Sequence, residues 1–325
     1  MDDGLRMVQA RACAAWALPG DPTCAGIARR IFQRVAAGLA LDSGLTDDGV
    51  LMVSELAANT LHAQQRELTP ANPELWLYLR GAGEHTELVC KVFDTLPGWV
   101  HDNVPGRVVP RAPADAMSGR GLEVVHELSG GHWGHHLSRS RATGSGARGK
   151  AVWFAVSASA VGTMTGTALG LPGPVTASEA MTELEMDLDS RGLGGKMVRA
   201  DDVAGDMAVL SIASGLTIWC RSAAVWLRVR GLAVQRWSYG DLVEAAEHAV
   251  QAHELTVPVA EPFPLADASL LGQLSGAAGP AYRARRAVPR HDLRGQPSGA
   301  DGRVSSGELP RTFQRAGPVE RQPAP

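Results

Sequence analysis

Two polar side chains lie one helical turn apart in a predicted helix and have the chemistry of a nucleotide–magnesium site. The segment Val53-Ser54-Glu55-Leu56-Ala57-Ala58-Asn59 places Glu55 and Asn59 on one helix face. Magnesium on a nucleotide takes most of its oxygen ligands from water and phosphate, so one amide oxygen, that of Asn59, would suffice. The Glu55 carboxylate could orient or deprotonate a nucleophile. Alone the pair is a weak signal, because Glu and Asn at this spacing more often form a solvated helix face.

Two further segments offer contacts to the base and the phosphates of a nucleotide. Asp94 ends an apolar strand and precedes Thr95-Leu96-Pro97-Gly98. Its carboxylate could accept a hydrogen bond from the exocyclic amine of adenine, although an Asp that only starts a turn is equally common. Gly119-Arg120-Gly121-Leu122 begins a helix after a long loop. Backbone amides at a glycine-rich helix start bind phosphate, and Arg120 would add positive charge.

The order of these segments resembles the GHKL (histidine-kinase-like) ATPases, and within them the actinobacterial anti-sigma-factor type of serine/threonine kinase. The resemblance covers residues 14–157 and includes the closing strand Gly149-Lys150-Ala151-Val152-Trp153-Phe154. It implies ATP and Mg2+ as ligands, held beneath a mobile lid over residues 99–118. The implied roles are magnesium binding for Asn59, assistance of transfer for Glu55 and adenine recognition for Asp94. The remaining implied nucleotide-binding residues are Gly98, Gly119, Arg120, Gly121 and Leu122.

The resemblance also implies a function and partners. Members of this group phosphorylate a serine on a small anti-anti-sigma partner of the STAS type, and some sequester a sigma factor. A dimer is implied as well, although the sequence shows no heptad pattern. Two departures are visible: Ala63 stands where the family often has a histidine, and the usual Asp-x-Gly-x-Gly is reduced to Asp94–Gly98. The competing hypothesis is therefore a non-catalytic module, with ATP or without a nucleotide, that regulates a partner by contact.

Hydrophobic periodicity predicts the elements that position these residues. Apolar side chains at helical spacing predict helices over 21–39 and 47–61, and a further helix begins near Gly121. Short apolar runs predict strands over 75–79, 88–93 and 152–156. The expected fold class is α+β: residues 1–157 form the GHKL α/β sandwich of helices over a mixed sheet, as the resemblance implies.

The sequence of the second half of the chain predicts a smaller domain between two flexible segments. Residues 158–181 have the composition of a linker, and residues 182–256 form a small α+β domain with strands over 208–212, 216–220 and 224–229. Ser238-Tyr239-Gly240-Asp241 fits a capping box before a helix that ends near His253. Residues 257–325, rich in Pro and Arg, are expected to be a disordered tail.

Composition and charge narrow the functional classes. The net charge of −3 provides no general basic surface, which argues against direct nucleic-acid binding. The uncharged stretch 151–178 contains two prolines and indicates a strand and a linker rather than a membrane span. Four scattered cysteines and no signal peptide indicate reduced thiols in a cytoplasmic protein.

Two other motifs carry little weight. Residues 144–150 fit the start of a P-loop, but Ala151 replaces the required Ser or Thr and a strand follows where a helix is needed. His132, His135 and His136 lack further Cys or His at zinc-site spacing, so a loop or strand edge is the expected setting.

Overall fold

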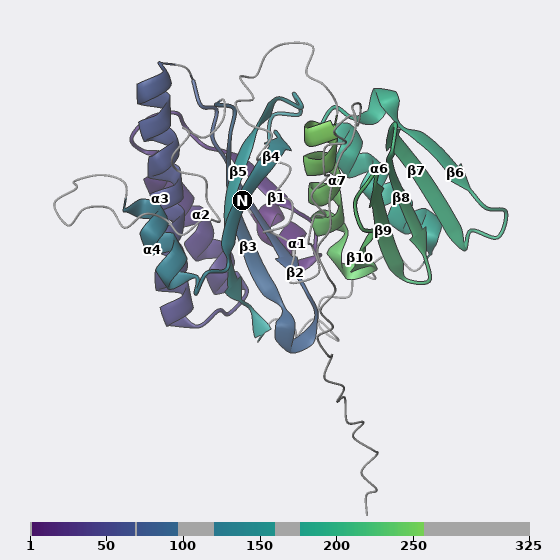
Figure 1. Cartoon of the computed structure of the whole chain (residues 1–325). Helices are drawn as coiled ribbons and strands as arrows, with labels where there is room; N and C mark the ends of the chain where they lie inside the picture. The colour runs from purple at the N-terminus through teal and green to yellow at the C-terminus, as the bar shows by residue number, and fades with distance from the viewer. Residues whose placement is uncertain (1, 69, 97–119, 160–175, 257–325) are drawn as a thin grey trace, which may run out of the picture. The chain divides into compact units, whose positions relative to one another are not determined.

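Two antiparallel five-stranded sheets with six helices make up the described part of the chain, in agreement with the expected α+β class (Figure 1). The structure, a computed structural model, describes residues 2–68, 70–96, 120–159 and 176–256. The predicted lid, most of the predicted linker and the predicted tail lie outside these ranges. No helix in the described ranges is long and apolar enough to cross a membrane.

The first sheet has the order β1-β2-β3-β5-β4 and every neighbouring pair is antiparallel. Its strands are β1 (Ala14–Ala17), β2 (Glu74–Arg80), β3 (Glu87–Asp94), β4 (Trp133–Arg139) and β5 (Arg148–Ser157). The expectation of a mixed sheet is therefore wrong for the described strands. The reason is strand order: β3 and β4 run in the same direction, but β5 lies between them and pairs with both.

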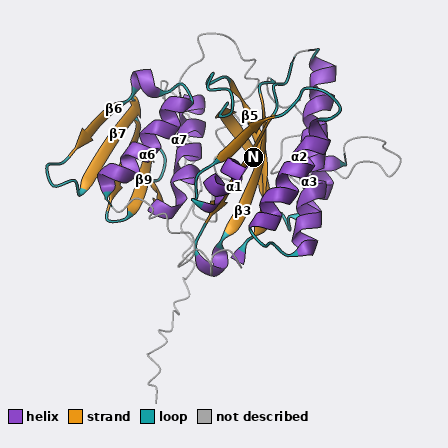
Figure 2. Cartoon of the chain, turned by 180° about the vertical axis from the view of Figure 1, so that it is seen from behind, coloured by secondary structure: helices purple, strands orange, loops and turns teal. Residues whose placement is uncertain are grey.

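Helices cover one face of this sheet and enclose the first hydrophobic core (Figure 2). They are α1 (Asp2–Gln9), α2 (Cys24–Gly38), α3 (Ser43–Glu67) and α4 (Gly121–Leu128). The core combines Phe32 of α2 and Leu56 of α3 with alternate residues of β2, β3 and β5. The start predicted for α3 at residue 47 is wrong, because the carboxylate of Asp42 accepts hydrogen bonds from the amides of Gly44 and Leu45 and caps the helix earlier.

The second sheet has the order β10-β9-β8-β7-β6 and packs two helices on one face. The predicted central strands are confirmed as β7 (Met207–Ala213), β8 (Leu216–Arg221) and β9 (Ala224–Val229). The edge strands β6 (Val198–Asp201) and β10 (Gln235–Ser238) were not predicted, because each has only four residues, of which at least two are polar. The helices are α6 (Ala177–Ser190), which begins inside the predicted linker, and α7 (Leu242–Thr256).

The capping box predicted at Ser238–Asp241 is wrong. A 3-10 turn over Tyr239–Asp241 precedes α7, and the Ser238 hydroxyl donates to the Asp241 carboxylate (2.8 Å) instead of capping the helix. The other Asp241 oxygen accepts the backbone amide of Gly81 (2.7 Å), in the turn between β2 and β3. A true capping box forms at α6, between Thr176 and Glu179.

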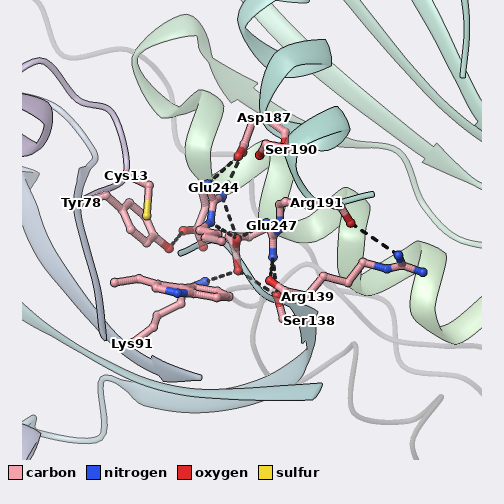
Figure 3. A network of polar contacts seen from close by, with 12 residues as sticks. Cys13, Tyr78, Lys91, Ser138, Arg139, Asp187, Ser190, Arg191, Glu244 and Glu247 are labelled. Atoms are coloured by element: carbon pink, nitrogen blue, oxygen red, sulfur yellow. Dashed lines mark hydrogen bonds and ion pairs between the residues drawn. The ribbon is translucent and has the colours of Figure 1, made fainter. Parts of the chain in front are cut away.

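Helix α7 packs against the first sheet through a buried carboxylate, Glu247 (Figure 3). Only 2% of Glu247 is exposed, and its oxygens accept from Lys91 (3.0 Å), Arg141 (2.9 Å) and the fully buried Arg191. Burial alone would raise the pKa of Glu247, but Arg191, Lys91 and Arg141 hold that pKa well below its usual range. The sheet face opposite α2 and α3 is thus closed by a charged cluster.

Two further carboxylates of α7 extend the contact. Glu244 accepts from the Tyr78 hydroxyl (2.5 Å) and pairs with Arg80 (3.4 Å). Glu254 pairs with Arg139 (2.6 Å) and Arg148. Glu244, Glu247 and Glu254 are three and seven residues apart, which places them on one face of α7, and all three meet basic or hydroxyl groups of the first sheet.

Replacing Glu247 is expected to destabilise the chain strongly. Glu247→Gln leaves the buried cations of Lys91 and Arg191 without a carboxylate partner and Arg141 with Asp187 alone, which should cost about 3–5 kcal/mol in urea unfolding at pH 7. Glu183→Gln, at an exposed carboxylate of α6, is the control and should change stability by about 0.5 kcal/mol or less. A Glu247→Gln loss no larger than that of the control would contradict the assigned role.

Candidate functional site

Helix α3 brings Glu55 and Asn59 to the first residue of α4. A Cβ atom built on Gly121 would lie 2.7 Å from Oε2 of Glu55 and 3.2 Å from Nδ2 of Asn59. Only a residue without a side chain allows this approach with both groups undisturbed. Three of the predicted site residues, from segments far apart in the sequence, therefore meet at one place.

The core-facing side of α3 fixes the direction of Glu55 and Asn59. Met52, Leu56 and Thr60 are buried, so the helix cannot rotate without exposing them. Glu55 and Asn59 are only partly buried and lie toward α4. The site is thus held by packing rather than by a loop.

Asp94 ends β3 and faces α3 with 3% of its surface exposed. Oδ1 accepts from the backbone amide of Leu96 (3.0 Å) and from Lys150, and Oδ2 accepts from the Thr60 hydroxyl (3.3 Å). Burial raises the pKa of Asp94, although Lys150 and these hydrogen bonds oppose the rise. Thr60 follows Asn59 directly, so Asp94 is joined to the helix that carries the Glu55–Asn59 pair.

Lys150 and Thr60 are functional candidates that sequence reasoning did not assign. Lys150 stands opposite Asp94 in the β3–β5 register and is itself buried. The sequence did contain a signal for this pair, because each of two apolar strands carries a charged residue near one end, Asp94 or Lys150. A buried charge needs a partner, so the two residues could have been predicted to pair. Thr60 reads as part of the apolar stripe of its helix, and nothing in its spacing indicates a contact to Asp94.

The structure describes only some of the other predicted nucleotide-binding residues. Arg120 is exposed and immediately precedes α4, and Leu122 packs, partly buried, against the first core. Gly98 and Gly119 lie outside the described residues.

The residues present fit a nucleotide with magnesium. The amide of Asn59 and the carboxylate of Glu55 are oxygen donors of the kind this ion prefers, and the first turn of α4 adds backbone amides beside them. No group of three or more His, Cys, Asp or Glu in the described ranges could hold a metal ion. Magnesium at this place would therefore take most of its ligands from phosphate and water rather than from the protein.

The end of the P-loop-like segment and His136 of the histidine cluster both lie in strands of the first sheet. Gly149 and Lys150 belong to β5, so the strand that argued against a P-loop is confirmed. His136 lies buried in β4 with Nε2 3.0 Å from Nζ of Lys91, and burial and Lys91 lower its pKa to about 3. This imidazole is neutral at pH 7 and belongs to the Glu247 cluster.

No model of a known protein family matches this chain, and no curated protein matches it in sequence.

Removing Lys150 is expected to destabilise the chain in a pH-dependent way. Lys150→Met leaves the buried Asp94 carboxylate without its cation, which should cost about 3–5 kcal/mol at pH 7. Because the pKa of Asp94 is already raised in the folded chain, protonation should remove part of this penalty near pH 4.

Urea unfolding of Lys150→Met at pH 7 and pH 4 measures the effect. The double variant Asp94→Asn/Lys150→Met is the matched control, because it removes both charges and should recover most of the stability at pH 7. An equal loss at both pH values would show that Lys150 does not act through Asp94.

Proposed function

We propose that this chain is an ATP-binding regulatory protein of the GHKL type that acts as a serine/threonine kinase. Its proposed substrate is an anti-anti-sigma protein of the STAS type, and its proposed second partner is a sigma factor. The contact of Gly121 with both Glu55 and Asn59 is the observation that supports the proposal most strongly. It brings a helix start, an amide side chain and a carboxylate together, and this supports a role in phosphoryl transfer, which asks mainly for positioning and charge neutralisation.

Each residue has a role that follows from its chemistry. Asn59 would donate its amide oxygen to magnesium, which when bound neutralises charge on the phosphates. The first amides of α4 would donate hydrogen bonds to phosphate oxygens, with Arg120 adding charge. Glu55 would accept the proton of the substrate serine as it attacks, since its carboxylate is partly exposed beside Asn59.

Asp94 would recognise the adenine base. Its Oδ2 accepts only the Thr60 hydroxyl among the described residues, and a carboxylate oxygen can accept a second donor. The exocyclic amine of adenine is such a donor, whereas guanine offers a carbonyl oxygen at that position. Lys150 and the Leu96 amide hold Oδ1 and so fix the direction of the carboxylate.

A non-catalytic interaction module is the second candidate function, and one observation favours it. The Asp94 carboxylate is buried and already has three partners, so the chain can satisfy this group without a nucleotide. In that case the chain would regulate a partner by contact alone. The two candidates differ in whether ATP binds with magnesium, and in whether Glu55 matters for transfer.

Asp94→Asn is expected to weaken ATP binding. The amide side chain loses the charge-assisted hydrogen bond to adenine, worth about 1.5–3 kcal/mol, so affinity should fall about 10- to 150-fold. Calorimetry of the full chain with ATP and Mg2+ measures this. Asp206→Asn, at an exposed carboxylate, is the control and should bind as the unmodified chain does. Wild-type affinity in Asp94→Asn would show that the base site is elsewhere.

Glu55→Gln is expected to slow turnover strongly while ATP binding is kept. Loss of the general base should slow release of the γ-phosphate from ATP by about 100-fold or more. The rate is measured with γ-labelled ATP, and affinity with calorimetry on the same samples. Glu127→Gln, at an exposed carboxylate of α4, provides the control. Unchanged turnover in Glu55→Gln would exclude the catalytic role, and absence of ATP binding by the unmodified chain would favour the interaction module.

A further inference from the structure

One face of the second sheet is left open by the helices that pack on that sheet. Helices α6 and α7 lie on the same side of this sheet, where they enclose the second hydrophobic core (Figures 1 and 2). The strand register places Val209, Trp219, Trp226 and Arg236 in one row across β7, β8, β9 and β10. Alternation along the strands directs this row away from the core, to which none of the four contributes.

Aromatic rings stand partly exposed at the centre of the open face. Trp219 and Trp226 stack with centroids 6.1 Å apart and ring planes at 5°. The Arg236 guanidinium lies 5.7 Å from the centroid of Trp226 and continues the stack. Cross-strand pairing stabilises the sheet, but it does not require the rings to remain in contact with solvent.

The open face is positively charged although the whole chain is acidic. Its charged residues are three exposed arginines, Arg221, Arg228 and Arg236. The outward positions of the five strands hold no Asp, Glu or Lys. These positions are Val198, Ala200, Met207, Val209, Ser211, Thr217, Trp219, Arg221, Ala224, Trp226, Arg228, Arg236 and Ser238. Within the described ranges, no ion pair is formed by any of the three arginines.

We propose that this face docks an acidic segment of a protein partner that also carries an aromatic or apolar side chain. Trp and Arg are the residues most enriched in the energetic centres of protein interfaces, and Lys is depleted there. The partner's apolar group would pack on the Trp219–Trp226 pair, and its carboxylates would pair with the surrounding arginines. Exposed Val198 and Met207 extend the apolar surface.

Charge argues against two other occupants. A second copy docking through the same face would bring three arginines against three arginines, which is repulsive. Single-stranded nucleic acid also uses aromatic platforms, but three arginines neutralise only about three phosphates, and the net charge of the chain is −3. An acidic protein segment with an apolar side chain would both pack on the tryptophan rings and pair with the arginines. The proposal does not depend on ATP binding.

Fluorescence anisotropy of the full chain tests this proposal with two labelled probes, a random glutamate–tyrosine copolymer and polyglutamate, in about 150 mM salt. The unmodified chain should bind both and prefer the tyrosine-containing probe by about threefold or more. Arg221→Glu/Arg228→Glu should weaken binding of both probes by about tenfold or more. Trp219→Ala should remove the preference for tyrosine.

Arg6→Glu/Arg30→Glu is the matched control, with two exposed arginines of α1 and α2 reversed, and should bind within about twofold of the unmodified chain. An equal loss in this control, or no binding by the unmodified chain, would overturn the proposal. So would tighter binding of a 20-nucleotide oligothymidine that depends on Arg221 and Arg228, or self-association that their reversal removes. ATP affinity, measured on the same variants, should be unchanged, which separates this test from that of the nucleotide site.

Discussion

A single buried carboxylate, Glu247, determines how the first sheet is closed on the side away from α2 and α3. Taking one carboxylate and three cations out of water costs several kcal/mol per ion, and the arrangement persists because each ion finds a partner. Arg191, which has no exposed surface, reaches Glu247, the Ser138 hydroxyl (2.5 Å) and the carbonyl of Arg139 (3.1 Å). Such a cluster tolerates little displacement, because moving α7 would leave several buried charges without partners at once.

Strand β3 connects this cluster with the candidate nucleotide site. Alternation along the strand directs Lys91 toward α7 and Asp94 toward α3, three residues later. Each of these two charged residues has an opposite charge on the neighbouring element, Glu247 for Lys91 and Lys150 for Asp94. Both faces of the strand are thus fixed by ion pairs, and the end of β3 that carries Asp94 is held rigidly.

The local part of this architecture was predictable from the sequence, and the non-local part was not. Periodicity predicts α3 and places Glu55 and Asn59 on one face, because both depend on residues within one turn. The Lys91–Glu247 pair joins residues 156 positions apart, and no pattern within either segment specifies its partner. Strand order has the same difficulty: β5 between β3 and β4 removes the parallel pair that a mixed sheet would need.

The capping box that failed at Ser238 shows how tertiary contacts override a local signature. The four residues satisfy the pattern, yet Asp241 is placed against the turn between β2 and β3, where the amide of Gly81 needs an acceptor. Arg11 donates to the carbonyls of Gly81 (2.7 Å) and Gly240 (3.3 Å), so both turns are held by one side chain. A helix start that could have been satisfied locally instead joins α7 to the turn between β2 and β3 of the first sheet. The contact between them is therefore built from backbone groups as well as from the buried ions, and sequence patterns report neither.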